Sequence, residues 1–591
     1  MSNRAAYLQA AEELRDNPGQ WAAYESRGHC VVLAGPGSGK TKTLTTKMAR
    51  LLAEDVAEPR GVACITYNNE CARELEARLS SLGVEPGGRV FVGTVHSFSL
   101  TQVILPYAKV AGLGLPDDFR VATNAEALAA LDDAAQVAMG AVPNLQTIRS
   151  QMGSYRRSIL NRDSDLWRDT NPRLARLAEA YEAELRVRGL IDFDDMPLLA
   201  VRALRENPWL QTALLAKYPV LVVDEYQDLG AALHRMVMGL CFSAGMRLFA
   251  VGDVDQSIYG FIGAQPQMLQ RLAEREDVEI IRLQLNYRSG HRIVAASGAV
   301  LGVDRGYAAV DGAPQGEIFF HSLGGSYEVQ ARRLMTDLLP AAMAREPGVR
   351  YDEIAVLYPA AWIGNAVAEA ARHAGVPFIR TDGNALYPRS SRLMQWLELS
   401  AQWCCGGWRT GSPRFSQLVS EGRRLFGDAI RAELDAAAFH RALVACLWEM
   451  RRPDMVLYDW LQRFKRTVLD QHAQLSPNLR DELNILGSFL ERVSPDADYA
   501  EMTVAEFAGE HTFDRLMLST LHSAKGREFR FVFLFGIDHG RLPRNGARPD
   551  EINESRRLFY VGISRARTEV HIAYTHGNSS IFVDELQARL N

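Results

Sequence analysis

The sequence contains little cysteine and no long hydrophobic run. Its seven cysteines lie scattered at positions 30, 64, 71, 241, 404, 405 and 446, without a Cys-x-x-Cys pair. An odd and scattered set argues against a disulfide framework or a cysteine-ligated zinc site, and it fits a reducing compartment. No apolar stretch approaches the ~18 residues that a membrane-spanning helix needs. Residues 1–20 are charged and lack the apolar core of a signal peptide, so we expect a cytoplasmic protein with no membrane partner.

The sequence also lacks an excess of positive charge. Lysine and arginine total 66 against 71 aspartate and glutamate residues, which gives a formal net charge of −5. This balance excludes a uniformly basic nucleic-acid coat protein. It leaves room for a basic groove, because affinity for a phosphate backbone depends on local patches. A hydrophobic fraction of 47% over 591 residues is typical of a globular chain, and this length predicts about four domains.

One glycine-rich segment carries the strongest chemical signal. It lies between the apolar run 30–33 and the helical pattern 43–48, and it reads Ala34-Gly35-Pro36-Gly37-Ser38-Gly39-Lys40-Thr41. Strand, glycine-rich turn, Lys-Thr and helix is the order of a P-loop, where backbone N–H groups and a helix N-terminus hold phosphate oxygens. We expect Lys40 to reach the β- and γ-phosphates of ATP and the Thr41 hydroxyl to hold Mg²⁺. A chance glycine-rich turn is the weaker alternative.

Acidic and polar residues follow two further apolar runs. The run 220–223 ends at Asp224 and Glu225, which is a Walker B arrangement. We expect Asp224 to bind Mg²⁺ and Glu225 to position and deprotonate the attacking water. The run 247–251 leads to Gln256, which we expect to hydrogen-bond the γ-phosphate or its water. The acid pair could instead cap a helix, but that reading is weak beside a P-loop.

Two arginine-containing segments complete the predicted nucleotide site. Residues 285–289 contain Tyr287, expected to stack on adenine, and Arg288, expected to touch the γ-phosphate. Residues 556–566 supply further arginines, and a cationic finger from a second domain accelerates phosphoryl transfer by about 10³–10⁵. A lone arginine is usually part of a surface ion pair, but its place in an ordered series of motifs disfavours that reading.

Strand and helix patterns predict two α/β cores. Apolar runs typical of strands lie at 62–66, 90–94, 220–223, 247–251, 318–320, 354–358, 516–520, 531–535 and 570–574. Residues 106–187 and 395–512 lack this rhythm and are helical and arginine-rich. We therefore predict an α/β protein with two parallel-sheet cores, each interrupted by a mainly helical insertion.

The order of these motifs resembles that of the UvrD/Rep/PcrA helicases of superfamily 1, subfamily A. The resemblance covers nearly the whole chain, and its most specific strings lie at 224–228, 252–260 and 520–529. It implies two RecA-like P-loop NTPase domains, 1A and 2A, with helical insertions 1B and 2B. The expected bounds are 1–105 and 188–285 for 1A, 106–187 for 1B, 286–394 and 513–591 for 2A, and 395–512 for 2B.

The resemblance adds three residues to the nucleotide site. It implies that Gln20 reads adenine, that Glu528 contacts the ribose, and that Arg565 faces ATP from domain 2A. Closing and opening of the two cores would then move the chain along single-stranded DNA. The implied function is an ATP-dependent 3′→5′ translocase and helicase that unwinds duplex at junctions of single- and double-stranded DNA.

The resemblance also implies a set of DNA contacts. Stacked bases contribute about 1–3 kcal/mol each; the matching aromatic residues are Tyr67, Phe98, Tyr259 and Phe261, and the matching polar residues are Thr94, His96, Thr520 and His522. A core position is the alternative for each aromatic residue, as a structural role is for each histidine. We further expect the arginines of both insertions to touch DNA, including Arg149, Arg156, Arg157 and Arg162, unless they form solvated helix faces.

Four departures from the family pattern bear on function. Phe261 and Ile262 stand where the family has Trp-Arg, and Glu70 stands where it usually has lysine. The predicted 2B insertion is shorter and has no Gly-Ile-Gly turn. The sequence ends soon after Arg565, so we expect neither a long C-terminal tail nor a fused nuclease. These departures favour translocation over unaided unwinding. The alternative to the translocase and helicase is a DNA-sensing or DNA-remodelling ATPase subunit that acts with a separate nuclease, as in anti-phage systems of Gabija type. A role in DNA repair and a role in anti-phage defence both stay open.

Overall fold

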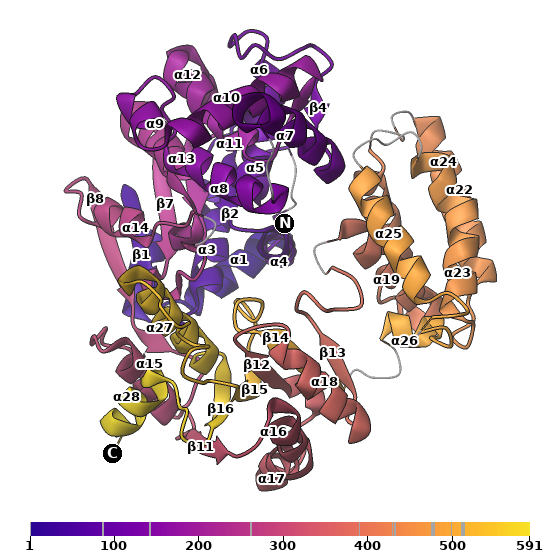
Figure 1. Cartoon of the computed structure of the whole chain (residues 1–591). Coiled ribbons are helices and arrows are strands. Elements are labelled where there is room, and N and C mark those ends of the chain that lie inside the picture. The colour runs from indigo at the N-terminus through magenta and orange to yellow at the C-terminus, as the bar shows by residue number, and fades with distance from the viewer. Residues whose placement is uncertain are drawn as a thin grey trace.

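The computed structural model of the chain describes residues 2–84, 88–140, 144–260, 263–388, 391–427, 430, 433–473, 479–497, 499–509 and 514–590. Two six-stranded sheets, each wholly parallel, form the centres of two cores that lie one above the other in Figure 1. A parallel sheet presents the carboxyl ends of all its strands at one edge, and that edge is where α/β proteins bind ligands.

The first sheet belongs to the first core. Its strand order is β3 (Val90–Thr94), β2 (Val62–Thr66), β6 (Val220–Val223), β7 (Arg247–Gly252), β1 (His29–Ala34) and β8 (Val278–Leu283). The strands are apolar throughout because both faces are covered. Along β1, Cys30 and Val32 enter one hydrophobic cluster and Val31 enters the cluster on the opposite face.

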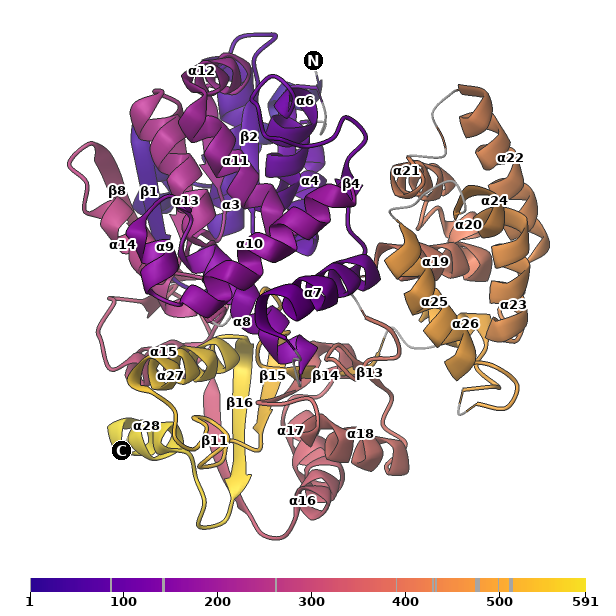
Figure 2. The ribbon, with the colours of Figure 1, turned by 45° about the horizontal axis from the view of Figure 1, so that its top comes forward.

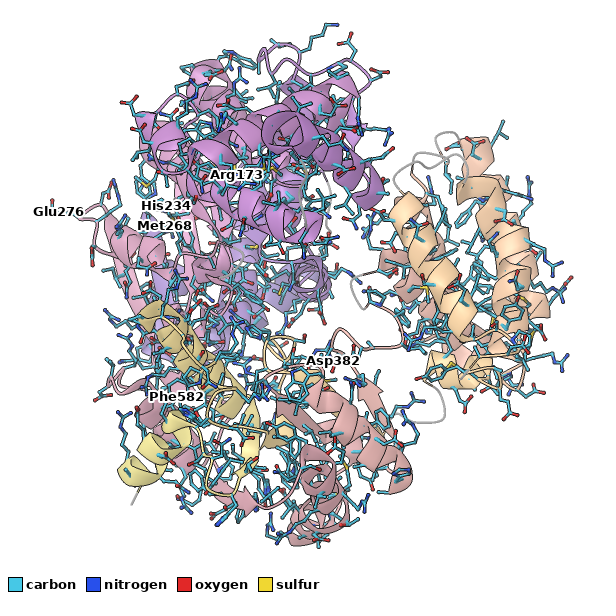
Figure 3. All side chains as sticks on the ribbon, in the orientation of Figure 1. Arg173, His234, Met268, Glu276, Asp382 and Phe582 are labelled. Atoms are coloured by element: carbon cyan, nitrogen blue, oxygen red, sulfur yellow. The ribbon has the colours of Figure 1, made fainter. Side chains whose placement is uncertain are left out.

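Helices cover both faces of this sheet. They are α1 (Ser2–Glu12), α2 (Pro18–Glu25), α3 (Lys40–Arg50), α4 (Asn69–Ser81), α5 (Val95–Phe98), α6 (Leu105–Tyr107), α11 (Asp195–Glu206), α12 (Pro208–Lys217), α13 (Ala231–Val237) and α14 (Pro266–Ala273). Local caps fix several starts: Asn17 accepts hydrogen bonds from two backbone N–H groups of α2, and Asn68 accepts one from α4. His234 of α13, labelled in Figure 3, contacts the Tyr226 hydroxyl at 2.9 Å.

The first insertion has a small hydrophobic core of its own. It consists of α7 (Asn124–Met139), α8 (Leu145–Ser158), α9 (Asp165–Asp169) and α10 (Pro172–Val187), and a short parallel pair, β4 (Arg120–Val121) and β5 (Leu190–Ile191), closes its base. Trp167 is fully buried at its centre. A capping box formed by Thr123 and Glu126 starts α7.

The second sheet has the order β11 (Glu317–Leu323), β16 (Ala566–Thr575), β15 (Phe529–Phe535), β12 (Ile354–Tyr358), β14 (Leu516–Thr520) and β13 (Phe378–Arg380). Helices α15 (His291–Leu301), α16 (Tyr327–Arg333), α17 (Leu339–Arg345), α18 (Ile363–His373), α27 (Pro549–Ile563) and α28 (Ile581–Leu590) cover it. A short parallel pair, β9 (Leu285–Asn286) and β10 (Ala308–Ala309), lies where the chain passes from the first core to the second.

The second insertion is a separate helical body beside the two cores (Figures 1 and 2). It contains α19 (Arg392–Gln402), α20 (Trp408–Thr410), α21 (Phe415–Leu425), α22 (Glu433–Glu449), α23 (Leu457–Phe464), α24 (Asp470–Ala473), α25 (Arg480–Arg492) and α26 (Val504–Ala508). Asp382, labelled in Figure 3, anchors the chain that leads into it, because Arg380 and Tyr358 both donate hydrogen bonds to its carboxylate. Helix α19 begins at Arg392, so the expected boundary at 395 falls inside it.

The predicted fold class is confirmed: two parallel α/β cores each carry a mainly helical insertion. The strands foreseen from apolar runs all lie within observed strands. Strands β8 and β13 were not foreseen, and neither were the short pairs β4–β5 and β9–β10. Within the described residues, no helix combines the length and the apolar character that crossing a membrane requires.

Candidate nucleotide site and nucleic-acid interface

The predicted P-loop connects the end of β1 to the start of α3. Gly37 and Gly39 have φ values of 67° and 81°, which L-residues with side chains rarely adopt. A Cβ atom on Gly39 would lie 2.5 Å from the amide nitrogen of Gln20. That amide donates a 2.8 Å hydrogen bond to the carbonyl of Ser38. Lys40 and Thr41 are the first residues of α3, so a phosphate in this cradle would meet the helix N-terminus.

The predicted Walker B acids lie opposite the P-loop lysine. The Lys40 Nζ atom is 3.7 Å from the Glu225 carboxylate, and a backbone hydrogen bond from Asp224 to Ile65 extends the end of β6. Glu225 has φ 49°, and it is the only non-glycine residue of the described ranges with a positive φ. Such strain persists where surrounding contacts impose it, and it concentrates at functional sites.

The two acids have opposite electrostatic environments. Burial, together with the adjacent Glu225 carboxylate, raises the pKa of Asp224. Burial also acts to raise the pKa of Glu225, but Lys40 and Lys525 outweigh it and hold that pKa below the ordinary value. A carboxylate whose ionisation is disfavoured in this way is stabilised by a cation. The Thr41 hydroxyl and the Asp224 carboxylate are hard oxygen donors that fit Mg²⁺ bound jointly with phosphates.

Residues 253–257, here called the sensor loop, follow β7. The Gln256 amide donates a 2.6 Å hydrogen bond to Asp253, and the Asp253 N–H donates one of 2.9 Å to Gln227. The Gln227 amide in turn donates to Glu225. Gln256 is therefore linked to the predicted general base through a continuous chain of hydrogen bonds. Its side chain is 3% exposed, which fixes the position of the amide.

The second core contacts the sensor loop through Arg565. This side chain is 2% exposed, and its Nη2 atom lies 3.2 Å from the Gln256 amide oxygen. Burial and the nearby Arg288 lower the pKa of Arg565 to about 9. The predicted finger and the predicted sensor thus meet at the contact between the two cores, which we call the seam. Arg565 also lies close enough to Glu225 to lower that residue's pKa.

Arg288 and Glu528, predicted for the γ-phosphate and the ribose, form an ion pair. The Arg288 Nε atom is 2.6 Å from the Glu528 carboxylate. The pair holds the pKa of Glu528 below its ordinary value, although burial acts to raise it. The Arg288 Nη1 atom also donates a 3.3 Å hydrogen bond to the Ser564 carbonyl.

The residues predicted for adenine recognition are also connected. The Asn17 amide donates a 3.0 Å hydrogen bond to the hydroxyl of Tyr287, whose ring is half-exposed. The Tyr287 N–H donates to the Gly37 carbonyl at 2.8 Å, and the Asn286 amide donates to the Pro36 carbonyl at 2.9 Å. The first residues of the second core are thereby bonded directly to the P-loop. Sequence reasoning did not assign Asn17 or Asn286 a role of its own.

Three of the residues predicted to contact DNA meet across the seam. The rings of Tyr67 and Tyr259 stack with centroids 4.6 Å apart. The Tyr259 hydroxyl donates a 3.3 Å hydrogen bond to the backbone of His522 in the second core. Burial lowers the pKa of His522 to about 4, so its ring is neutral at physiological pH.

The other predicted polar contacts have local structural partners. Thr94 accepts a hydrogen bond from the Ser97 N–H, and Thr520 accepts one from the Ser523 N–H. The ring of His96 lies 5.2 Å from Phe193, which is 64% exposed. Sequence reasoning missed Phe193; a phenylalanine flanked by the acids Asp192 and Asp194 is the signal that could have revealed it.

Two expectations about DNA contacts are wrong. Phe98 is fully buried in the core of the first domain, so it cannot stack on a base. Arg156 is also fully buried, because Glu182, Asp192 and Asp195 surround its guanidinium at 2.7–2.8 Å.

Arg162 and Phe261 were also predicted to contact DNA. Arg162 lies over the Trp167 ring at 3.7 Å and pairs with Glu182, so it supports the first insertion. Phe261, predicted to stack on a base, lies outside the described residues.

A groove of about 900 Å³ runs along the seam, and neither Tyr67 nor Tyr259 is among the described residues that line it. Gly260 and His522 line it, as do Trp362 and Arg541 of the second core. Trp362 is 48% exposed, and the Arg541 guanidinium lies 4.9 Å from its ring centre. Sequence reasoning missed both residues, because neither belongs to a motif and only the fold brings them together.

Comparison with known proteins agrees with this geometry. The model of the UvrD/REP helicase N-terminal domain matches residues 16–277, and that of the UvrD-like helicase C-terminal domain matches residues 454–577. The chain belongs to the UvrD/Rep helicase family. Members of this family are ATP-dependent DNA helicases, so the chain is an enzyme that uses ATP and acts on DNA.

Individual relatives align over most of the chain. The ATP-dependent DNA helicase Rep of Escherichia coli is 26% identical over 94% of this chain and 90% of its own length. The ATP-dependent DNA helicase UvrD1 of Mycobacterium tuberculosis is 26% identical over 95% of this chain and 83% of its own. A probable DNA helicase II homolog of Rickettsia felis is 25% identical over 95% and 92%, respectively.

Proposed function

We propose that this helicase moves 3′→5′ along single-stranded DNA and unwinds duplex at a junction. The observation that carries the proposal is the seam, where Arg565 of the second core contacts Gln256 of the first. Gln256 is linked through Asp253 and Gln227 to the Glu225 carboxylate, 3.7 Å from Lys40. A nucleotide bound at the P-loop would therefore be sensed by both cores.

Each side chain of the site has a proposed role in hydrolysis. Lys40 neutralises the β- and γ-phosphates, and Glu225 accepts a proton from the attacking water. Gln256 positions that water, and Arg565 stabilises charge that develops on the transferred group. Thr41 and Asp224 would hold Mg²⁺, which supplies further charge neutralisation on the phosphate oxygens when it is bound.

The domain assignment is part of the same proposal. We assign residues 1–105 and 188–285 to domain 1A, 106–187 to 1B, 286–391 and 513–591 to 2A, and 392–512 to 2B, the start of 2B being moved from 395 because α19 begins at Arg392. The separate hydrophobic clusters of the two helical bodies support this division. The boundary at 512 lies outside the described residues.

The DNA path is proposed to follow the groove along the seam. Trp362 with Arg541 offers a face and a cation from the second core, and Tyr259 of the first core, which stacks on Tyr67, directly precedes the groove residue Gly260. Phe193 adds an exposed ring beside His96. Aromatic faces with neighbouring cations suit single strands, because every base has a π-face.

Strand displacement by the purified chain tests the proposal. Duplexes carrying a 3′ tail and duplexes carrying a 5′ tail are compared in the presence of ATP and Mg²⁺, with DNA-stimulated ATP hydrolysis measured in parallel. We expect displacement from the 3′-tailed substrate alone. Preference for the 5′ tail would refute the direction, and hydrolysis that DNA does not stimulate would refute coupling at the seam.

The same assay separates the proposal from the hypothesis of a nuclease partner. A DNA-sensing ATPase subunit would hydrolyse ATP on single-stranded DNA but displace no strand by itself. The roles in repair and in anti-phage defence, and the nuclease partner itself, stay predictions, and none of the contacts described above favours one over another.

A further inference from the structure

The helical body of the second insertion carries two arginines stacked on two tryptophans. The Arg451 guanidinium lies 3.4 Å from the Trp448 ring centre and 4.3 Å from that of Trp408. The Arg409 guanidinium lies 4.6 Å from the Trp408 ring centre. The two rings are 5.9 Å apart and inclined at 67°. We call these four residues the Trp–Arg cluster.

The local chain is built to bring these side chains together. Gly406 interrupts the helical geometry before α20, and Gly407 packs closely against Pro413, so that Trp408 turns toward the end of α22. Trp448 is 52% exposed on α22, whereas Trp403 behind it is buried. The Arg451 Nε–H donates a 2.8 Å hydrogen bond to the Trp448 carbonyl, which fixes the plane of the guanidinium.

The charges of this cluster are not neutralised by nearby acids. Within the described residues, neither Arg409 nor Arg451 forms an ion pair, although the neighbouring Arg463 pairs with Glu449. A guanidinium whose face is covered by an aromatic ring keeps its N–H edge free for a planar, bidentate partner. The cluster therefore presents two oriented positive charges on the protein surface.

A second aromatic and basic patch lies beyond the cluster, on the other side of the buried Trp403. The Trp403 ring lies 5.4 Å from Phe415, which stacks on His440. Phe415 and His440 line a hollow of about 610 Å³ together with Arg423 and Arg424. Helices α20, α21 and α22 bring these parts together on one body (Figure 2).

We propose that the Trp–Arg cluster binds the phosphodiester backbone of DNA outside the seam groove. The proposal rests on the proposed action on DNA and adds a second contact point to it. Phosphate oxygens match the paired N–H groups of an arginine, and such contacts are independent of base sequence. The backbone could belong to the duplex ahead of the junction or to a single strand. An acidic protein segment offers carboxylates instead, and the test below includes it.

The experiment measures the affinity of the full chain for fluorescent DNA over a range of salt concentrations. The probes are a blunt duplex, a 3′-tailed duplex and oligo-dT. The test variant is Arg409→Gln with Arg451→Gln. The matched control is Arg441→Gln with Arg466→Gln, which removes the same charge from exposed positions of the same body that, among the described residues, do not lie over a ring. Thermal melting checks that every variant is folded.

We expect the test variant to bind the duplex-containing probes about tenfold more weakly, with a salt slope that is smaller by about 2. The control variant should change affinity by less than about twofold. Loss on the duplex probes but not on oligo-dT would assign the contact to duplex, and the reverse would assign it to a single strand. Equal losses in test and control variants would overturn the proposal.

A charge-conserving variant tests the stacked geometry. Arg409→Lys with Arg451→Lys keeps the charge but lacks the planar fork, so we expect an affinity between those of the parent chain and the glutamine variant, with the salt slope of the parent chain. Binding equal to that of the parent chain would overturn the role of the stacked, planar guanidinium. A different outcome would favour an acidic protein partner: polyglutamate binds the parent chain but not the glutamine variant, while both bind DNA equally well. That outcome would overturn the proposed DNA contact. Stimulation of ATP hydrolysis by oligo-dT tests the seam separately, so its failure would count against the proposed function and not against this site.

Discussion

Replacement of Arg565 by alanine tests the seam most directly. The guanidinium is buried, and of its four hydrogen bonds only that to Gln256 crosses from the second core to the first. An arginine finger contributes about 10³–10⁵ to the rate of phosphoryl transfer, which corresponds to about 4–7 kcal/mol of activation free energy. We therefore expect kcat for ATP hydrolysis at saturating oligo-dT to fall by at least about 10³.

The assay must separate chemistry from binding and from folding. Nucleotide affinity, measured with a fluorescent ATP analogue, should change far less than kcat, because Lys40 and the P-loop remain intact. Arg567→Ala is a suitable control, since Arg567 lies two residues away, is half-exposed and pairs only at 3.6 Å with Glu528. Arg565→Lys keeps the charge but not the fork that reaches Gln256, so we expect intermediate activity.

A kcat for Arg565→Ala within tenfold of the parent value, in a variant that melts normally, would refute the reasoning. Arg565 would then be a structural residue of the second core, bonded to the Val561 and Arg527 carbonyls. An equal loss in the Arg567 control would instead show that the local turn, and not the finger, had been disturbed.

Three further predictions follow from the same contacts. Lys40→Ala should abolish ATP turnover, because its charge faces both the phosphates and Glu225; turnover at the parent rate would contradict the P-loop assignment. Tyr259→Leu should weaken stimulation of the ATPase by oligo-dT, since the ring stacks on Tyr67 and its hydroxyl bonds the His522 backbone; an unchanged response would remove Tyr259 from the DNA path. His321 lies 3.0 Å from a ring nitrogen of His571, and burial lowers its pKa to about 4. Between pH 6.5 and pH 4 the unfolded chain therefore binds a proton at this histidine that the folded chain does not bind. The free energy of unfolding should decrease as the pH falls through this range. Thermal melting of His321→Asn should therefore be less sensitive to acid than that of the parent chain, and identical profiles would exclude this histidine as the cause.

The strands inside the two sheets could be predicted because burial on both faces makes them continuously apolar. Strands β2, β6, β12 and β14 begin and end where the apolar runs do. The edge strands β3 and β11 could be predicted as well, whereas the edge strand β8 escaped prediction because the exposed charged residues Glu279 and Arg282 interrupt its apolar run. Strand β13 is also at an edge, and its three residues are too few to form a pattern.

The candidate site could be predicted to the extent that its parts are local. A P-loop or a Walker B strand is encoded by consecutive residues, so the positions of Lys40 and Glu225 followed from spacing. Contacts between distant segments could not be foreseen in this way. Lys525, for example, pairs with Asp228 across 297 positions, and the sequence alone gives no sign that either needs a partner.

The basic stretch of the first insertion shows that closeness in the sequence can also lead to a wrong prediction. Arg156 looked like a DNA contact because arginines cluster near it in the sequence. The structure buries it among three carboxylates that lie 26, 36 and 39 positions away. A buried guanidinium surrounded by acids is costly to leave unpaired, so this arrangement fixes the orientation of α8 and α10 instead of binding phosphate.

The sensor loop explains how events at ATP and at DNA can be mechanically linked. Beyond Arg565, three groups of the second core hold it: Arg305 pairs with Asp255 at 2.7 Å, Lys525 donates to the Gln256 carbonyl at 2.6 Å, and Arg557 donates to the Ser257 carbonyl at 2.6 Å. The chain that follows the sensor loop leads to Tyr259 and then to Gly260, which lines the groove of the proposed DNA path.

A displacement of the second core cannot leave this segment in place unless all these contacts break. Burial raises the pKa of Asp228 to about 7 against the opposing effect of Lys525, so removal of the lysine would leave a buried acid without its cation. The least costly movement keeps the contacts and carries the loop, with Tyr259, along with the second core. A change at Arg565 would then reach the Tyr259 ring through only a few residues of chain.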